Sequence, residues 1–124
     1  MVETIITPDP LPLTIEEKIM AKAKEYGYSP TRAIAIAKAE SGLFPDAKNT
    51  SSTASGLFQF INGTAQGFCV EKYEIMESLL EKNDPDKQIE CAVRMLAEGG
   101  EGHWSESRHV WGVTDSLVLQ VDNQ

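Results

Sequence analysis

A single carboxylate, Glu40, lies where the sequence predicts the end of a helix and the start of a polar loop. The Ala-rich segment at about 31–41 predicts the helix, and Gly42 follows at a position where helices commonly end. The helix C-terminus carries partial negative charge, so it favours the protonated acid, as apolar neighbours also do. The apolar neighbours that we expect are Leu43, Phe44, Leu57 and Phe58. A carboxyl group that stays protonated near neutral pH can serve as a general acid. A solvated glutamate at a helix end is the alternative, because spacing does not reveal burial.

Three short motifs follow one another from Glu40 onward. They are Glu40-Ser41-Gly42, then Gly56-Leu57-Phe58-Gln59-Phe60, then Asn62-Gly63-Thr64-Ala65. This ordered set resembles the signature of the lysozyme-like lytic transglycosylase family (soluble lytic transglycosylase, or SLT, type). The signature of that family reads Glu-Ser, Gly-Leu-Met-Gln-Ile and Pro-x-Thr-Ala. Phe58, Phe60 and Asn62 replace the Met, Ile and Pro of that signature, and the resemblance extends over residues 15–97.

The resemblance implies a mainly α-helical, small lysozyme-like fold with a substrate cleft between the Glu40 helix end and the strip 56–60. It also implies cleavage of the β-1,4 bond between N-acetylmuramic acid and N-acetylglucosamine in peptidoglycan, with Glu40 as general acid and then base. The residues expected to contact the glycan are Ser41, Ser55, Gly56, Leu57, Phe58, Gln59, Phe60 and Trp104.

Three of these assignments have structural alternatives. Gln59 can hydrogen-bond a sugar or the loop backbone. Ser41 is assigned to orienting Glu40 or bracing the loop, because no His/Asp pair stands near it to make it a nucleophile. Trp104 and Trp111 can stack on a sugar or close the core.

The number of carboxylates bears on the reaction. Most glycosidases use two carboxylates. Asp46 is the next acidic residue after Glu40, and we predict that it is a loop residue. A single acid favours a lytic transglycosylase, in which the N-acetyl group of the substrate stabilises the oxocarbenium ion and a 1,6-anhydro end forms. A hydrolytic muramidase with the same acid is the alternative.

The segment after the last predicted helix motivates a hypothesis of another class. The Ala-Tyr-Asn-Ala-Gly motif of larger family members is absent there, and the chain is acidic. A non-catalytic module that binds wall glycan fits both observations. A structural part of a secretion or phage tail assembly is a third alternative.

The elements that must position these residues are predicted helices. Residues 1–13 contain three prolines and predict an extended lead-in, and 14–124 form the catalytic domain. Thr14 and Glu17 form a capping box for a helix that ends near Tyr26. Ser29-Pro30 begins the next helix, whose many alanines predict a central position.

Two further helices are predicted downstream. The segment 70–82 is weakly helical, and its expected packing face comprises Tyr73, Met76, Leu79 and Leu80. Asp84-Pro85 opens the clearest amphipathic helix. Its apolar face comprises Ile89, Ala92, Val93 and Leu96.

Composition excludes several classes of protein. A chain of 124 residues makes one domain, and a net charge of −8 without a basic patch argues against nucleic acid as a partner. No apolar run approaches the ~18 residues of a membrane span. We expect a monomer that acts on peptidoglycan outside the cell, in the periplasm or at the wall, or a phage-derived protein, although no signal segment is visible.

The two cysteines predict no metal site. Cys69 and Cys91 form no CxxC motif, and His103 and His109 lie well away from them in the sequence. They form either one disulfide, worth ~3 kcal/mol in the loop-entropy model, or two buried thiols. No cofactor is expected.

Overall fold

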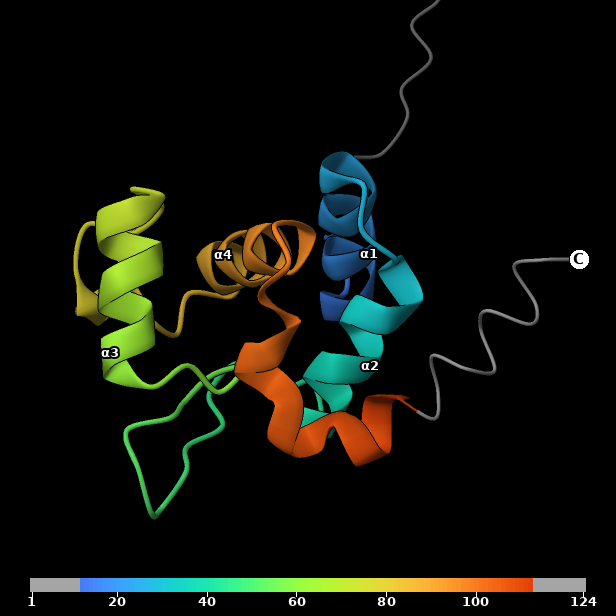
Figure 1. Cartoon of the computed structure of the whole chain (residues 1–124). Coiled ribbons are helices and arrows are strands. Elements are labelled where there is room, and N and C mark those ends of the chain that lie inside the picture. The colour runs from blue at the N-terminus through green and yellow to red at the C-terminus, as the bar shows by residue number, and fades with distance from the viewer. Residues whose placement is uncertain (1–11, 113–124) are drawn as a thin grey trace, which may run out of the picture.

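The computed structural model describes residues 12–112, which form a mainly helical domain with no strand in that range (Figure 1). The helical elements are α1 (Ile15–Tyr26), α2 (Pro30–Ser41), α3 (Asn62–Thr64), η1 (Ala65–Lys72), η2 (Leu79–Glu81), α4 (Pro85–Ala97) and η3 (Gly100–Ser107). Residues 108–112 add a last helical turn. The expected lead-in at 1–13 lies almost wholly outside the described residues. No helix between residues 12 and 112 is long and apolar enough to cross a membrane.

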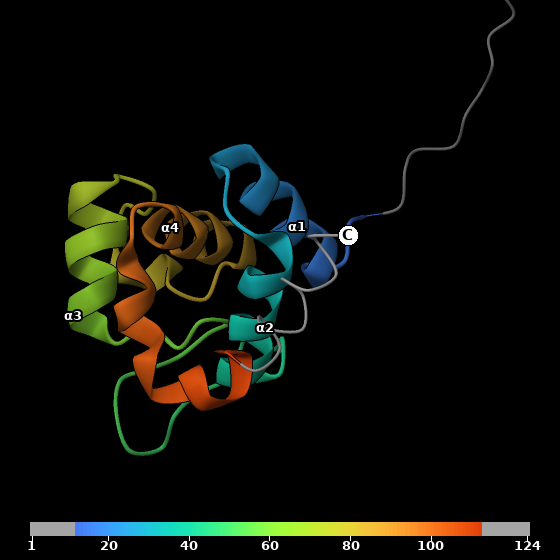
Figure 2. The same ribbon diagram turned by 45° about the vertical axis from the view of Figure 1, so that its right-hand side comes forward.

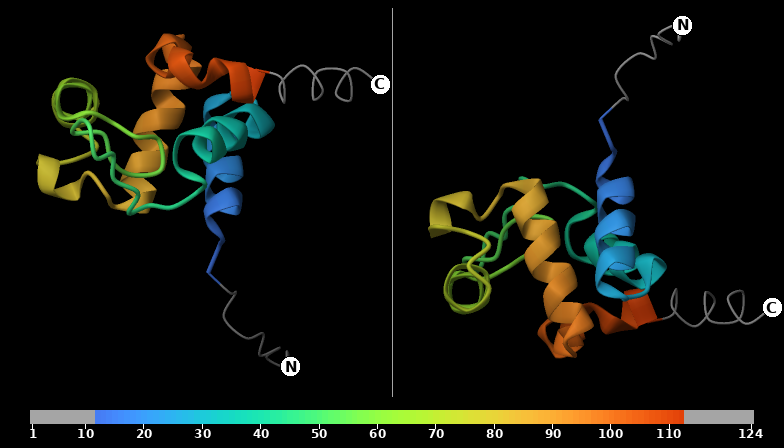
Figure 3. Two further views of the ribbon diagram at one scale, coloured as in Figure 1. Left: turned by 90° about the horizontal axis from the view of Figure 1, so that it is seen from below. Right: turned by 90° about the horizontal axis from the view of Figure 1, so that it is seen from above.

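Helix α4 occupies the middle of the domain. It lies between α1 on one side and α3 with η1 on the other (Figures 1 and 3), and it contacts α1, η1 and η3. Its buried residues are Gln88, Ile89, Cys91, Ala92, Val93, Met95 and Leu96. The sequence predicted α2 as the central helix, which is wrong. The alanines of α2 instead allow close packing against α1 and η3.

The three predicted helix starts are confirmed, because each has the side chain that its first turn requires. The hydroxyl of Thr14 accepts a hydrogen bond from the Glu17 N–H, and Glu17 accepts one from the Thr14 N–H. Ser29 caps α2 in front of Pro30, and the carboxylate of Asp84 caps α4. These local contacts fix where the long helices begin.

The predicted helix over 70–82 is wrong in its position. The helix comes earlier, over 62–72, and the chain then turns back, with the N–H groups of Ile75 and Met76 both donating to the Cys69 carbonyl. Tyr73 and Met76 are buried as expected, but Leu80 is 96% exposed. The apolar spacing of this segment therefore reflects a turn packed against the core.

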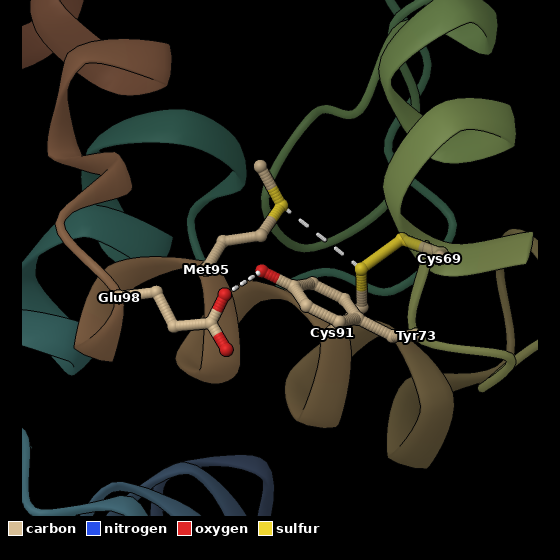
Figure 4. Close-up of a disulfide and its surroundings, with 5 residues drawn as sticks. All are labelled: Cys69, Tyr73, Cys91, Met95 and Glu98. Carbon is tan, nitrogen blue, oxygen red and sulfur yellow. Dashed lines mark hydrogen bonds between the residues drawn. A yellow bond between two sulfur atoms is a disulfide. The ribbon is translucent and has the colours of Figure 1, made fainter. Parts of the chain in front are cut away.

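A disulfide joins η1 to the central helix. Cys69 and Cys91 are bonded, with their Cα atoms 5.5 Å apart (Figure 4). Beside the disulfide, the Tyr73 hydroxyl donates to Glu98 Oε1 at 2.7 Å. Closing this loop of the unfolded chain contributes about 3 kcal/mol to stability. The bond fixes the lobe formed by α3 and η1 against α4.

A buried glutamine of α4 holds the strip 56–60 in place. Gln88 Oε1 accepts a hydrogen bond from the Leu57 N–H at 2.5 Å, and Gln88 Nε2 donates to the Pro45 carbonyl at 3.5 Å. Gly56 has φ +89°, and a Cβ atom there would lie 2.0 Å from Gln88 Oε1. Only glycine therefore lets the backbone come this close to Gln88.

Aromatic packing attaches η3 to the same strip. Trp104 Nε1 donates to the Phe58 carbonyl at 2.8 Å, and its ring centroid lies 6.0 Å from the centroids of Phe58 and Phe60. Trp111 Nε1 donates to the Trp104 carbonyl. Both tryptophans are buried, so the core-closing role is the one that the structure supports.

We predict that Gly56→Ala lowers the free energy of unfolding by about 2–4 kcal/mol, because the substitution adds both positive-φ strain and a clash with Gln88. Urea denaturation followed by circular dichroism measures the change. Gly63→Ala is the matched control, since a Cβ atom there meets nothing within 4 Å. The control should leave stability unchanged or raise it by about 0.5–1 kcal/mol. Equal effects of the two substitutions would contradict the role given to Gly56.

Candidate active site

Glu40 lies in the last turn of α2, next to a turn that a serine braces. Gly42 ends the helix with φ +67°, and Leu43 follows with φ +71°. Ser41 Oγ donates to the Ala37 carbonyl and accepts from the Leu43 N–H, each at 3.1 Å. The serine therefore stabilises the strained turn beside the acid.

Two hollows meet at Glu40 and together form an open groove. The first, of about 520 Å³, is lined by Glu40, Asn49, Ser52, Ala54, Gln59, Phe60, Ile61, Thr64 and residues 102–106. The second, of about 590 Å³, is lined by residues 39–42, 47–51 and 59. Glu40, Asn49 and Gln59 line both. A groove that continues past the carboxylate suits an extended ligand such as a glycan strand.

Size alone does not single out this groove. Another hollow, of about 510 Å³, lies between α1 and α4. Its acidic residues are paired with lysines: Asp86 with Lys18, and Glu25 and Glu90 with Lys22. Glu40 has no such partner among the ion pairs of residues 12–112, so the groove around it offers an acid free to react.

Three influences set the protonation of Glu40. Burial raises its pKa, the hydrogen bond from Ser107 opposes that shift, and the negative charge of Glu106 adds to it, so the pKa of Glu40 is raised. The direction agrees with the expectation from the sequence. The environment differs from the expected one, because Phe44 is 68% exposed and the carboxylate of Glu106 contributes to the raised pKa.

Ser107 can hydrogen-bond Glu40 in both of its protonation states. Its Oγ lies 2.5 Å from Glu40 Oε2 and 3.2 Å from the Trp104 carbonyl oxygen. When Glu40 is ionised, the hydroxyl donates to it. When Glu40 is protonated, the carboxyl donates to Ser107 Oγ, and the hydroxyl can turn its proton to the Trp104 carbonyl. The arrangement suits a group that acts alternately as acid and base.

Both amide protons of Gln59 are donated to the backbone of the protein. Nε2 donates to the Ala47 and Gly56 carbonyls at 3.1 and 2.9 Å. The sequence left two alternatives for Gln59, a sugar or the loop backbone as its partner. The hydrogen bonds to the backbone are present. The side chain still lines the groove, so its carbonyl oxygen is the atom left to accept from a ligand.

Most of the strip 56–60 supports the groove instead of contacting a ligand. Leu57 and Phe58 are 0% exposed, so their expected contact with the glycan is corrected: they belong to the core. Gly56 is placed against Gln88. Phe60 and Trp104 line the groove but are nearly buried, which leaves no open face for stacking on a sugar.

Ser55 lies apart from the groove. Its Oγ donates to Asn83 Oδ1 at 3.1 Å, and it lines a separate hollow beside the loop 48–55. Asp46 lines neither of the two hollows that meet at Glu40.

Sequence reasoning missed Glu106 and Ser107. Both belong to η3. Glu101, near the start of η3, accepts from Arg32 of α2 and from Tyr28, which lies just before α2. The segment has no apolar periodicity and no family motif, so nothing in its spacing pointed to Glu40, which lies 67 residues away. Within residues 12–112, no group of three or more His, Cys, Asp or Glu side chains is arranged to hold a metal ion.

Fold and groove together define a small helical domain of the lysozyme-like class. The family model described as Transglycosylase SLT domain matches residues 17–105. The chain therefore belongs to the SLT transglycosylase domain family, and membership implies lytic transglycosylase-type activity on peptidoglycan. No curated protein and no solved structure matches the chain.

We predict opposite shifts of the Glu40 pKa in two variants of η3. Ser107→Ala removes a hydrogen bond that favours the ionised form, so the pKa of Glu40 should rise. Glu106→Gln removes a like charge, so the pKa should fall. Titration of the Glu40 carboxyl carbon by NMR measures both. Ser105→Ala is the control, because Ser105 is exposed and should leave the titration unchanged. Shifts in the same direction for both variants would contradict this electrostatic account.

We predict that Glu40→Gln makes the protein more stable at pH 7. The folded-state pKa of Glu40 is raised above its unfolded value, so the stability of the wild type falls as pH rises through the folded-state pKa. Glutamine has no charge to bury, so the Tm of the variant should exceed that of the wild type at pH 7. The difference should vanish below the unfolded-state pKa. Glu74→Gln, at an exposed position, serves as the control. A lower Tm for Glu40→Gln at pH 7 would refute the assigned burial effect.

Proposed function

We propose that this protein is a lytic transglycosylase that cleaves the β-1,4 bond between N-acetylmuramic acid and N-acetylglucosamine, with Glu40 as its general acid and base. The observation that carries the proposal is a half-buried carboxyl group with a raised pKa in an open groove. Family membership supplies the substrate class. Action at the wall, outside the cell or in the periplasm, and a monomeric state are parts of the same proposal.

In the first step, protonated Glu40 gives its proton to the glycosidic oxygen, and the bond from that oxygen to C1 of the muramoyl residue breaks. The acetamido oxygen of the substrate stabilises the positive charge that develops at C1. The N-acetylglucosamine portion leaves with a free hydroxyl. Glu40 is now ionised and accepts a hydrogen bond from Ser107 Oγ.

In the second step, ionised Glu40 removes the proton of the muramoyl C6 hydroxyl. The C6 oxygen attacks C1 and closes the 1,6-anhydro ring, and Glu40 returns to its protonated form. Ser107 can then accept from the carboxyl and donate to the Trp104 carbonyl. No water is consumed, so the open side of the groove does not have to hold a nucleophilic water.

A specific observation favours hydrolysis as the second candidate. Glu106 lines the same hollow as Glu40 and is close enough to raise its pKa. A second carboxylate in the groove can serve as a base that activates water, as in inverting glycosidases. The sequence offered only Asp46 for this role. In this alternative, Glu40 remains the acid and the product has a reducing end.

We predict that mass spectrometry of purified peptidoglycan digested by the wild type will detect 1,6-anhydro muropeptides. Glu40→Gln removes the proton donor and should lower the rate at least about 100-fold. Glu106→Gln should retain the anhydro products, and Glu74→Gln is the control for loss of an acidic charge away from the groove.

The alternatives predict different products. Reducing-end products that disappear in both Glu40→Gln and Glu106→Gln would establish a muramidase. Wall binding without products from any variant would overturn catalysis on this substrate and favour a glycan-binding module.

A further inference from the structure

A separate hollow of about 360 Å³ lies next to the catalytic groove, and the loop 48–55 contributes to both. Four residues line both the groove and this hollow: Lys48, Asn49, Ser52 and Ala54. The hollow is lined by residues of the loop 48–55, by Asn62 and by residues of the segment 79–83. We call it the lysine hollow. A glycan bound at Glu40 would therefore pass beside it.

The charge of the lysine hollow is opposite to that of the whole chain. Its lining includes two lysines and no Asp or Glu, although the net charge of the chain is −8. The remaining polar groups are amides and hydroxyls, which donate readily to an anion. This hollow offers an electrostatic preference for a negatively charged ligand.

Lys82 is the unusual member of this set. It is only 6% exposed, and its ammonium group donates to the Thr53 carbonyl at 2.5 Å and to Asn62 Oδ1 at 2.9 Å. An ammonium group has three protons, and no ion pair of Lys82 is found within residues 12–112. Burial lowers the pKa of Lys82, and no carboxylate offsets that shift. A buried cation held only by neutral groups favours an anion in the adjoining space.

The rim of the lysine hollow is apolar on one side. Leu80, which lines it, is 96% exposed. The preferred ligand therefore combines a carboxylate with small apolar groups. The peptide stem attached to N-acetylmuramic acid has this chemistry, because it carries alanine methyl groups and free carboxylates close to the glycan.

We propose that the lysine hollow is a subsite for the peptide stem of peptidoglycan, in which Lys82 and Lys48 bind a carboxylate of the stem. This inference rests on the proposed function, since it takes peptidoglycan as the substrate. It makes the protein selective for glycan strands that still carry their peptides.

The test is a binding measurement that needs no turnover. The probe is the γ-methylamide of N-acetylmuramoyl-L-alanyl-D-glutamic acid. It keeps the free α-carboxylate that glutamate has within a stem, and it has no glycosidic bond to cleave, so failure of catalysis does not affect the result. Its amidated form is the neutral control, and N-acetylmuramic acid alone tests the lactyl carboxylate of the sugar as the source of the charge. Two-dimensional NMR of the wild type should locate the probe at residues 48–55 and 79–83, with weaker binding of the amidated form and of the sugar.

Three lysine variants test the assignment. Lys48 is exposed, so Lys48→Gln removes charge without removing a buried contact, and it should weaken probe binding about two- to fivefold. Lys82→Gln should weaken it more than about tenfold. Lys24→Gln, at an exposed position on α1, should have no effect.

If Lys82→Gln unfolds because it also removes the contact with the loop, Lys48→Gln decides. Equal binding of the amidated form, equal binding of N-acetylmuramic acid, or no binding at residues 48–55 and 79–83 would each overturn the subsite. Such a result would leave Lys82 as a brace of the loop and would not affect the proposed role of Glu40.

Discussion

The hydrogen bond from the Leu57 N–H to Gln88 Oε1 is the interaction on which the groove depends. It is buried, and it links the central helix to a strip that has only isolated bridges in place of a sheet. An unpaired amide there would cost about 1–3 kcal/mol. Because Gln88 also reaches Pro45, a single side chain of α4 positions both ends of the loop that faces Glu40. The absence of a side chain at Gly56 permits this approach.

The segment η3 completes the site from the opposite side. Figure 2 shows η3 passing beside α2. Glu101 ties η3 to α2 and Trp104 ties it to the strip, so the Ser107 hydroxyl reaches Glu40 from a supported backbone. The acid is thus held between two elements that are distant in sequence. Preorganised contacts of this kind lower the cost of orienting a catalytic group during reaction. They also make η3 the part of the domain that tunes the acidity of Glu40.

Charge is arranged unevenly around the loop 48–55. On one side, Glu106 and partial burial keep Glu40 more readily protonated, which suits an acid. On the other side, Lys48 and Lys82 form the cationic lysine hollow in a chain that is otherwise acidic. A polymer with neutral sugars and charged peptides presents both kinds of group at once. In the function that we propose, one loop therefore contributes to contacts with both.

The sequence by itself determined the helix starts at Thr14, Ser29 and Asp84, the end of α2 at Gly42, and the order of motifs around Glu40. These features depend on contacts between residues a few positions apart, and the spacing of residue types along the sequence indicates such contacts. Only the tertiary structure decided that Leu57 and Phe58 are core residues, that α4 is central, and that Ser107 and Glu106 face Glu40. Those outcomes depend on packing between segments far apart in the chain, for which local periodicity carries no signal.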